Sequence, residues 1–477
     1  MGHRTILAAL VAMGCARAVG ATGVLADDLV GTSIGNDFLL DASFGNAGSA
    51  QVPCDGVTYN APLRIARDAS GYSLLGSHVA YLGAGYEQFM VVRLNADGTL
   101  DPSFGDGGCL VAQPPLDVIS DATRGDDGRY YAAGTLTRAD DTPIAAVACF
   151  GADGTRCAGF GPYDGLAVVD GFDLRQLPRL LFRDGSLFLV GAASLSSSGR
   201  TDTVLVAKLD AATAAPDPAF GTGSPAPGEA IFDLGELPGG SITTPAAVLD
   251  GPRVLVGGAA ESTPEGGTVG YVLAFDAATG VADAGFANGG VFAIALGNTI
   301  ETVETKALAV RADGRIAVAG NAILNASGTV RQIVLAELDA GGAYADDFAG
   351  GGMTHLTIGH GTDVSALALR ADGSLVVAMT SNGLLPDEAT DSQQQSVAEF
   401  DASGTGPVST ASIAFELSIP PTPPYSFATA LDVDAADRVV LAGGHFYGKI
   451  GGTLISIGVE MTATRFVRDA IFASGFD

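Results

Sequence analysis

Three recurring patterns in this 477-residue sequence predict a fold built from strands alone. The phrase Asp-x-x-Phe-Gly-x-x-Gly returns about every sixty residues. An Asp-Gly turn lies between successive copies, and a short stretch of alternating apolar and polar residues leads on to the next phrase. A period of this length is typical of repeat architectures, in which each unit buries its apolar face against its neighbours. With about four antiparallel strands in each of seven units, the sequence predicts an all-β, seven-bladed β-propeller.

The phenylalanine phrase is clearest at residues 101–108, and looser copies surround it on both sides. Its phenylalanines are Phe44, Phe104, Phe160, Phe220, Phe286, Phe348 and, two periods later, Phe472. Seven periods separate the first from the last, which favours seven blades over six or eight. We expect each phenylalanine to pack between neighbouring blades, while the glycines allow the positive φ angles of tight turns.

The Asp-Gly turn predicts a hairpin in every unit, because both central residues of such a turn need positive φ. It is strongest at Asp184-Gly185, Asp313-Gly314 and Asp372-Gly373. Weaker copies bring the number to seven and lie at residues 68–71, 126–128, 250–251 and 435–437.

The alternating stretches predict half-buried strands, and Val204–Asp210 and Ile333–Asp339 are examples. Each unit then has one strand after the phrase, two strands flanking the turn, and one strand running to the next phrase. We expect residues 27–43 to share one blade with the last strands and so to close the ring. An open solenoid is the alternative, although it would need protected ends.

The chain divides into three parts. Residues 1–26 are expected to form a secretory signal peptide, because His3 and Arg4 precede an uncharged apolar stretch and small residues allow cleavage after Ala26 or after Ala21. Lipid attachment at Cys15 is the less favoured alternative. Residues 27–468 are expected to form the propeller. Residues 469–477 form a Phe-Gly type tail, either a sorting signal or one more repeat phrase. The protein is therefore expected to be secreted or to lie at the cell surface or in the periplasm.

The formal net charge of −29 disfavours binding to nucleic acid or to anionic membranes, which are themselves negatively charged. No segment after the signal peptide has the 18 or so apolar residues of a membrane helix. We expect a monomer without a membrane span.

Four cysteines remain after removal of the signal peptide, and an even number fits disulfides in an oxidising compartment. Cys149 and Cys157 flank a turn-rich stretch that would bring them together, which leaves Cys54 and Cys109 as the second pair. Four cysteines permit three connectivities, so this pairing is a preference.

No motif predicts catalytic or cofactor-binding residues. The sequence has no Gly-x-Ser-x-Gly nucleophile turn and no phosphate-binding loop. His355 and His360 lack the pattern of a zinc site. Whether a metal binds is open: oxygen ligands for one calcium ion gather at residues 95–101 and 432–437, although solvent-exposed turn residues are the simpler interpretation.

The order Asp-Gly, Val-Ala-Gly, Leu-Asp-x-x-Phe-Gly-x-x-Gly resembles the delta-60 repeat family of bacterial β-propeller-like proteins, over about residues 37–465. The resemblance implies a secreted or surface-associated β protein and assigns no reaction.

We therefore expect an exported, non-enzymatic propeller that acts as a binding or structural module, with a surface glycan or protein as its partner. Its working surface would lie in long loops, for which the candidates are Ser194–Asp202, Glu261–Thr268 and Leu384–Gln395. The alternative is a secreted carbohydrate-active enzyme, a hydrolase or lyase, with carboxylates and His355 or His360 at the mouth of the central channel.

Overall fold

The computed structural model describes residues 29–34, 38–52, 54, 59–79, 87–138, 141, 143–172, 177–193, 203–221, 226–234, 242–261, 267–294, 302–323, 331–359, 361–382, 393–415, 425–451 and 454–468. The proposed signal peptide (1–26) and tail (469–477) lie outside these residues.

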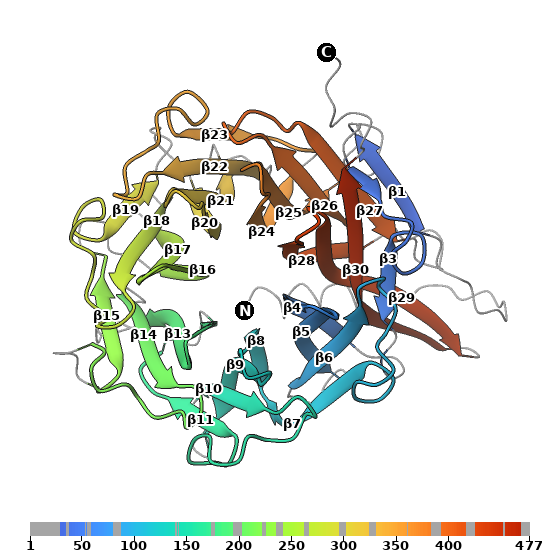
Figure 1. The fold of residues 1–477 in the computed structure, drawn as a ribbon, viewed down its shortest axis with the longest axis horizontal. Coiled ribbons are helices and arrows are strands. Elements are labelled where there is room, and N and C mark those ends of the chain that lie inside the picture. The colour runs from blue at the N-terminus through green and yellow to red at the C-terminus, as the bar shows by residue number, and fades with distance from the viewer. Residues whose placement is uncertain are drawn as a thin grey trace.

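The described chain is all-β and propeller-like. Its sheets are arranged radially about a common centre, with the first strand of each sheet near the centre and later strands further out (Figure 1). Within the described ranges every regular element is a strand, and none is a helix of the length and apolarity needed to cross a membrane.

The first half of the chain contributes three groups of four strands. One contains β4 (Tyr59–Asp68), β5 (Gly71–Val79), β6 (Glu87–Asn95) and β7 (Cys109–Leu116). The next contains β8 (Val118–Arg124), β9 (Tyr130–Thr137), β10 (Pro143–Phe150) and β11 (Leu166–Val169). The third contains β12 (Arg179–Arg183), β13 (Ser186–Ala193), β14 (Thr203–Asp210) and β15 (Glu229–Asp233).

The following strands form an eight-stranded sheet whose two halves meet at one parallel pair, Thr268 with Thr302. The first half contains β16 (Ile242–Asp250), β17 (Arg253–Glu261), β18 (Thr268–Asp276) and β19 (Val291–Ile294). The second contains β20 (Thr302–Val310), β21 (Ile316–Ile323), β22 (Gln332–Leu338) and β23 (Met353–Leu356).

The last strands of the chain form two further groups. One sheet contains β24 (Thr362–Leu369), β25 (Leu375–Asn382), β26 (Gln393–Phe400) and β27 (Ser409–Phe415). The final group contains β28 (Ser426–Val433), β29 (Val439–Gly451) and β30 (Leu454–Arg468), and it joins the sheet of β4 at one parallel pair, Val459 with Tyr59.

The N-terminal strands join sheets made by the C-terminal part of the chain. β2 (Phe38–Leu40) and β3 (Ser49–Val52) pair antiparallel with β30. β1 (Leu29–Ile34) instead pairs with β27, so residues 27–43 do not all share the last sheet as the sequence suggested. By adding a strand to β27, β1 covers an edge that would otherwise be open to other chains.

The apolar core lies between neighbouring sheets, and the repeat phrase helps to hold them together. Phe220 is 1% exposed, and its ring lies 6.0 Å from that of Phe188 in its own sheet and 6.3 Å from that of Phe275 in the next. The following residue, Gly221, donates its N–H to the carbonyl oxygen of Thr279 at 2.8 Å, in the turn of the next sheet. The phenylalanine therefore packs between sheets, as the repeat predicted.

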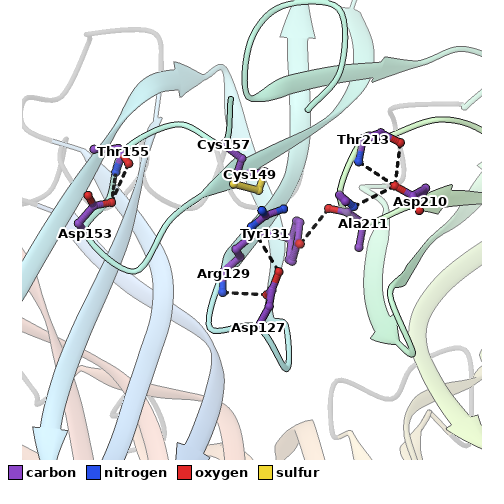
Figure 2. The surroundings of a disulfide bond; sticks show 11 residues. Asp127, Arg129, Tyr131, Cys149, Asp153, Thr155, Cys157, Asp210, Ala211 and Thr213 are labelled. Carbon is purple, nitrogen blue, oxygen red and sulfur yellow. Dashed lines mark hydrogen bonds and ion pairs between the residues drawn. A yellow bond between two sulfur atoms is a disulfide. The ribbon is translucent and has the colours of Figure 1, made fainter. Parts of the chain in front are cut away.

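Two disulfides are present. Cys54 is joined to Cys109, with a Cα–Cα distance of 6.1 Å, and Cys149 is joined to Cys157, with a Cα–Cα distance of 5.4 Å. Figure 2 shows the second bridge near Tyr131, which donates a 2.9 Å hydrogen bond to the carbonyl oxygen of Ala211. Disulfides persist in oxidising compartments, which indicates an extracytoplasmic location.

Replacing Cys149 and Cys157 together by serine should lower the free energy of unfolding by about 2 kcal/mol, because the bridge restricts a short loop in the unfolded chain. Urea unfolding of the oxidised protein measures this loss, and peptide mapping without reduction should find Cys149 linked to Cys157. A peptide linking either of them to Cys54 would contradict the pairing.

Candidate functional site

The inner strands share a local irregularity that changes the direction of their side chains. In six of them, the register with the following strand shifts at one point, as between Pro62 and Arg64 in β4 and between Ile119 and Asp121 in β8. Such bulges bend a strand and re-aim the residue that follows. Bulges are over-represented next to active sites, so the residue after the bulge is a candidate site residue.

Arg64 and Asp121 occupy this place on adjacent inner strands and form a bidentate ion pair. Arg64 donates from Nε to Asp121 Oδ1 at 2.7 Å and from Nη2 to Oδ2 at 2.9 Å. The Asp121 side chain is fully buried, whereas that of Arg64 is 40% exposed. The pair therefore has one end in the protein interior and one end in contact with solvent.

Asp121 also connects three inner strands. Its carboxylate accepts hydrogen bonds from the N–H groups of Ala122 at 2.9 Å and Leu180 at 3.0 Å, the latter on β12. Burial alone would raise the pKa of Asp121. The charge and hydrogen bonds of Arg64, the charge of Arg179 and the Leu180 N–H together hold that pKa below its ordinary value.

Arg179, at the start of β12, is the third charged residue of this group. It is half-buried, and its guanidinium makes no hydrogen bond or ion pair within the part of the chain that the structure describes. Burial lowers the pKa of Arg179, and Asp121 compensates only in part because Arg64 lies nearby as well. An arginine stays protonated under these conditions, so Arg179 is a cation without a dedicated partner.

The three residues Arg64, Asp121 and Arg179, which we call the guanidinium cluster, were not found from the sequence. The corresponding residue after the bulge is alanine on the other inner strands: Ala246, Ala307, Ala366 and Ala430. Aligning the repeats at this position would have revealed three charged residues where the other units have alanine.

A second charged group lies on inner strands β20 and β24 and includes Arg331, which directly precedes β22. Lys306 Nζ lies 2.9 Å from Glu304 Oε2 and 4.0 Å from Asp363 Oδ1, and Arg331 Nη1 lies 3.3 Å from Asp363 Oδ2. Asp363 is 52% exposed. Glu304 and Asp363 are therefore carboxylates of neighbouring inner strands.

The histidines do not join this group in the described structure. His355 lies on the outer strand β23, where its Nδ1 is 3.0 Å from Gln332 Oε1. His360 lies outside the described residues. An enzyme that combines inner carboxylates with His355 is therefore not supported by the geometry.

The two calcium candidates are occupied by internal hydrogen bonds. Asp97 Oδ1 accepts from the N–H of Thr99 at 3.0 Å, and Asp101 Oδ1 accepts from the N–H of Ser103 at 3.0 Å. Asp434 accepts from Tyr72 Oη at 3.0 Å. Among the described residues no three His, Cys, Asp or Glu side chains gather as metal ligands, and the aspartates act as turn and ion-pair residues.

The loops expected to form a working surface are mostly outside the described chain. Residues 194–202, 262–266 and 384–392 of the three candidates are not described.

Comparison with protein-family models gives one short match. The model described as a domain of unknown function (DUF5122) β-propeller matches residues 77–104, which include β6 and one copy of the phenylalanine phrase. The match supports a β-propeller family, and delta-60 is not part of its description. No curated protein matches the chain.

Similar solved structures cover most of the chain at low identity. The polysaccharide lyase Uly1 is 9% identical, with 92% of this chain and 99% of that chain covered and a TM-score of 0.47. The propeller domain of the Trilobed protease from Pyrococcus furiosus is 8% identical, with 85% and 94% covered and a TM-score of 0.41. A thermostable family-43 glycoside hydrolase is 10% identical, with 86% and 95% covered and a TM-score of 0.33.

These comparisons correct one sequence-based prediction. The prediction that the protein is not an enzyme is wrong, because the similar structures include a polysaccharide lyase and a glycoside hydrolase.

Proposed function

We propose that the protein is an exported, seven-bladed β-propeller that binds a saccharide of the cell exterior through side chains of its inner strands. Seven blades are supported by the two large sheets, because each divides at a single parallel residue pair into groups of about four strands. Export by way of a signal peptide at residues 1–26 agrees with the two disulfides.

The observation that carries this proposal is that five partly exposed charged side chains lie on the inner strands. Arg64, Arg179, Glu304, Lys306 and Asp363 all lie on the inner strands or at their bulges. Polar groups that converge from several elements are typical of ligand sites, where they fix orientation and specificity. Carboxylates of the outer phrases, in contrast, accept hydrogen bonds from their own turns.

A glycan array and a cell-surface pulldown with residues 27–477 test the proposal. We expect binding to a subset of glycans, and Asp363→Asn should weaken it about tenfold, because hydrogen bonds to a charged group contribute on the order of 1.5–3 kcal/mol. Asp170→Asn is the matched control, because Asp170 is 74% exposed and follows the outer strand β11. Absence of glycan binding, or equal loss in both variants, would contradict the proposal.

A second candidate is catalysis on the same class of ligand by a hydrolase or lyase. It is favoured by Glu304 and Asp363, whose carboxylates lie on neighbouring inner strands and both within 4.0 Å of Lys306 Nζ. Glycoside hydrolysis commonly uses two carboxylates on opposite sides of the bond that breaks. Assaying glycans that bind for new reducing ends or unsaturated products distinguishes catalysis from binding alone, with Glu304→Gln as the inactive variant.

A further inference from the structure

We propose that Arg64 and Arg179 bind an acidic group of the ligand, a carboxylate or a sulfate ester. This inference rests on the proposed function, since it names the chemistry of the saccharide that the inner strands would hold. It depends on three properties of the guanidinium cluster: its net charge, the filled acceptor positions of Asp121, and the solvent exposure of Arg64.

The charges of the cluster do not cancel. Arg64 and Arg179 contribute two positive charges and Asp121 contributes one negative charge, so the cluster has a net charge of +1. This is unusual in a chain with a formal net charge of −29, which has carboxylates in excess. A half-buried cation whose charge is balanced only in part favours an anion brought by a ligand.

Asp121 has no free capacity to accept a hydrogen bond from Arg179. Its two oxygens already accept four hydrogen bonds, two from Arg64 and one each from the N–H groups of Ala122 and Leu180. A carboxylate offers about four acceptor positions. The Arg179 guanidinium must therefore find its acceptor elsewhere, and its five N–H donors match the planar oxygens of carboxylate or sulfate.

The backbone holds the two guanidinium groups in place without closing the site. The hydrogen bond from Leu180 N–H to Asp121 fixes the strand beside Arg179, and the ion pair fixes Arg64 from the other side. Nη1 of Arg64 makes no hydrogen bond to any described residue, and the Arg64 side chain is 40% exposed. On the next inner strand the corresponding residue is Ala246, whose side chain offers no hydrogen-bond acceptor.

Calorimetric titration of residues 27–477 with sodium sulfate, sodium glucuronate and glucose tests the inference. We expect sulfate and glucuronate to bind at low ionic strength, glucose to bind more weakly, and added sodium chloride to weaken the two anions. In Arg179→Gln the affinity for both anions should fall at least tenfold. Because the Arg179 guanidinium makes no hydrogen bond or ion pair with the residues that the structure describes, this variant should keep the wild-type circular dichroism spectrum.

Arg138→Gln is the matched control, because Arg138 is also partly exposed but pairs with Asp170 outside the cluster. Wild-type affinity in Arg179→Gln, equal losses in both variants, or equal binding of glucose and glucuronate would overturn the inference. If neutral glycans bind and Arg179→Gln has no effect, the proposed function is supported and recognition of an acidic group is contradicted. If no glycan binds while anion binding depends on Arg179, the anion site is supported and the proposed saccharide ligand is contradicted.

Discussion

Replacing Asp121 by alanine is expected to lower the free energy of unfolding by about 4 kcal/mol at pH 7, within the range for breaking a buried ion pair. Asp121 is fully buried and is the counterion of Arg64. Its removal leaves the Arg64 guanidinium without its counterion, and the Leu180 N–H loses its acceptor. Urea unfolding followed by far-UV circular dichroism measures the loss.

A double variant separates the charge from the packing. When Asp121→Leu is combined with Arg64→Met, the buried charge and its partner are both removed. We expect this variant to be more stable than Asp121→Ala, because apolar replacement of a whole ion pair is often close to neutral. A double variant less stable than the single variant would show that the ion pair is not the cause.

The Asp121 carboxylate should make the free energy of unfolding depend on pH. The pKa of Asp121 is lowered in the folded protein, so its stabilising effect is complete above the unfolded value of 3.8 and is lost as the pH falls through the folded pKa. The stability difference between wild type and Asp121→Asn should therefore be constant near pH 7 and shrink below about pH 4. A difference that is the same at pH 3 and pH 7 would contradict the assignment.

The contacts of the repeat phrase and of the short disulfide loop could be predicted from the sequence, because the residues that make each feature are close together in the chain. The phrase places Phe220 and Gly221 side by side, and both contact the next sheet as the repeat suggested. The turn-rich stretch between Cys149 and Cys157 likewise predicted that they could be joined.

The guanidinium cluster could not be predicted in the same way. Arg64 and Asp121 are separated by 57 positions, and they meet only because β4 and β8 are neighbouring inner strands with bulges at the same level. Nor does the strand pattern of β1 say which of two neighbouring sheets it joins, since pairing depends on which edge is open. These features depend on the relative placement of units, which a repeat period alone does not contain.

Replacing Arg465 by alanine is expected to lower the free energy of unfolding by about 4 kcal/mol, because the loss combines a buried ion pair with a cation–π contact. The Arg465 side chain is 2% exposed, and its Nε lies 2.7 Å from Asp41 Oδ2. Its guanidinium lies 4.5 Å from the centre of the Phe44 ring. It also donates to Ser43 Oγ at 3.2 Å and to the carbonyl oxygen of Ala96.

These contacts make one side chain the link between three distant parts of the chain. Arg465 belongs to β30, Asp41 follows β2, and Ala96 lies in the turn after β6. Lys208 has a similar role inside a single unit, with Nζ 2.8 Å from Asp217 and 5.8 Å from the Phe220 ring. The comparison suggests that a cation bound to the aspartate of the phrase supports its phenylalanine, and that Arg465 does so where the two ends of the chain meet.

Local and global effects can be separated by hydrogen exchange. In Arg465→Ala the amides of β2 and β3 should exchange faster than those of β13 and β14, because the N-terminal strands are held to β30 partly through this side chain. Arg465→Lys should recover part of the loss, since lysine keeps the charge but not the fork of donors. Arg138→Ala is the control, because that ion pair is exposed and should contribute little. An Arg465→Ala protein as stable as this control, with unchanged exchange in β2 and β3, would show that strand pairing alone joins the two ends.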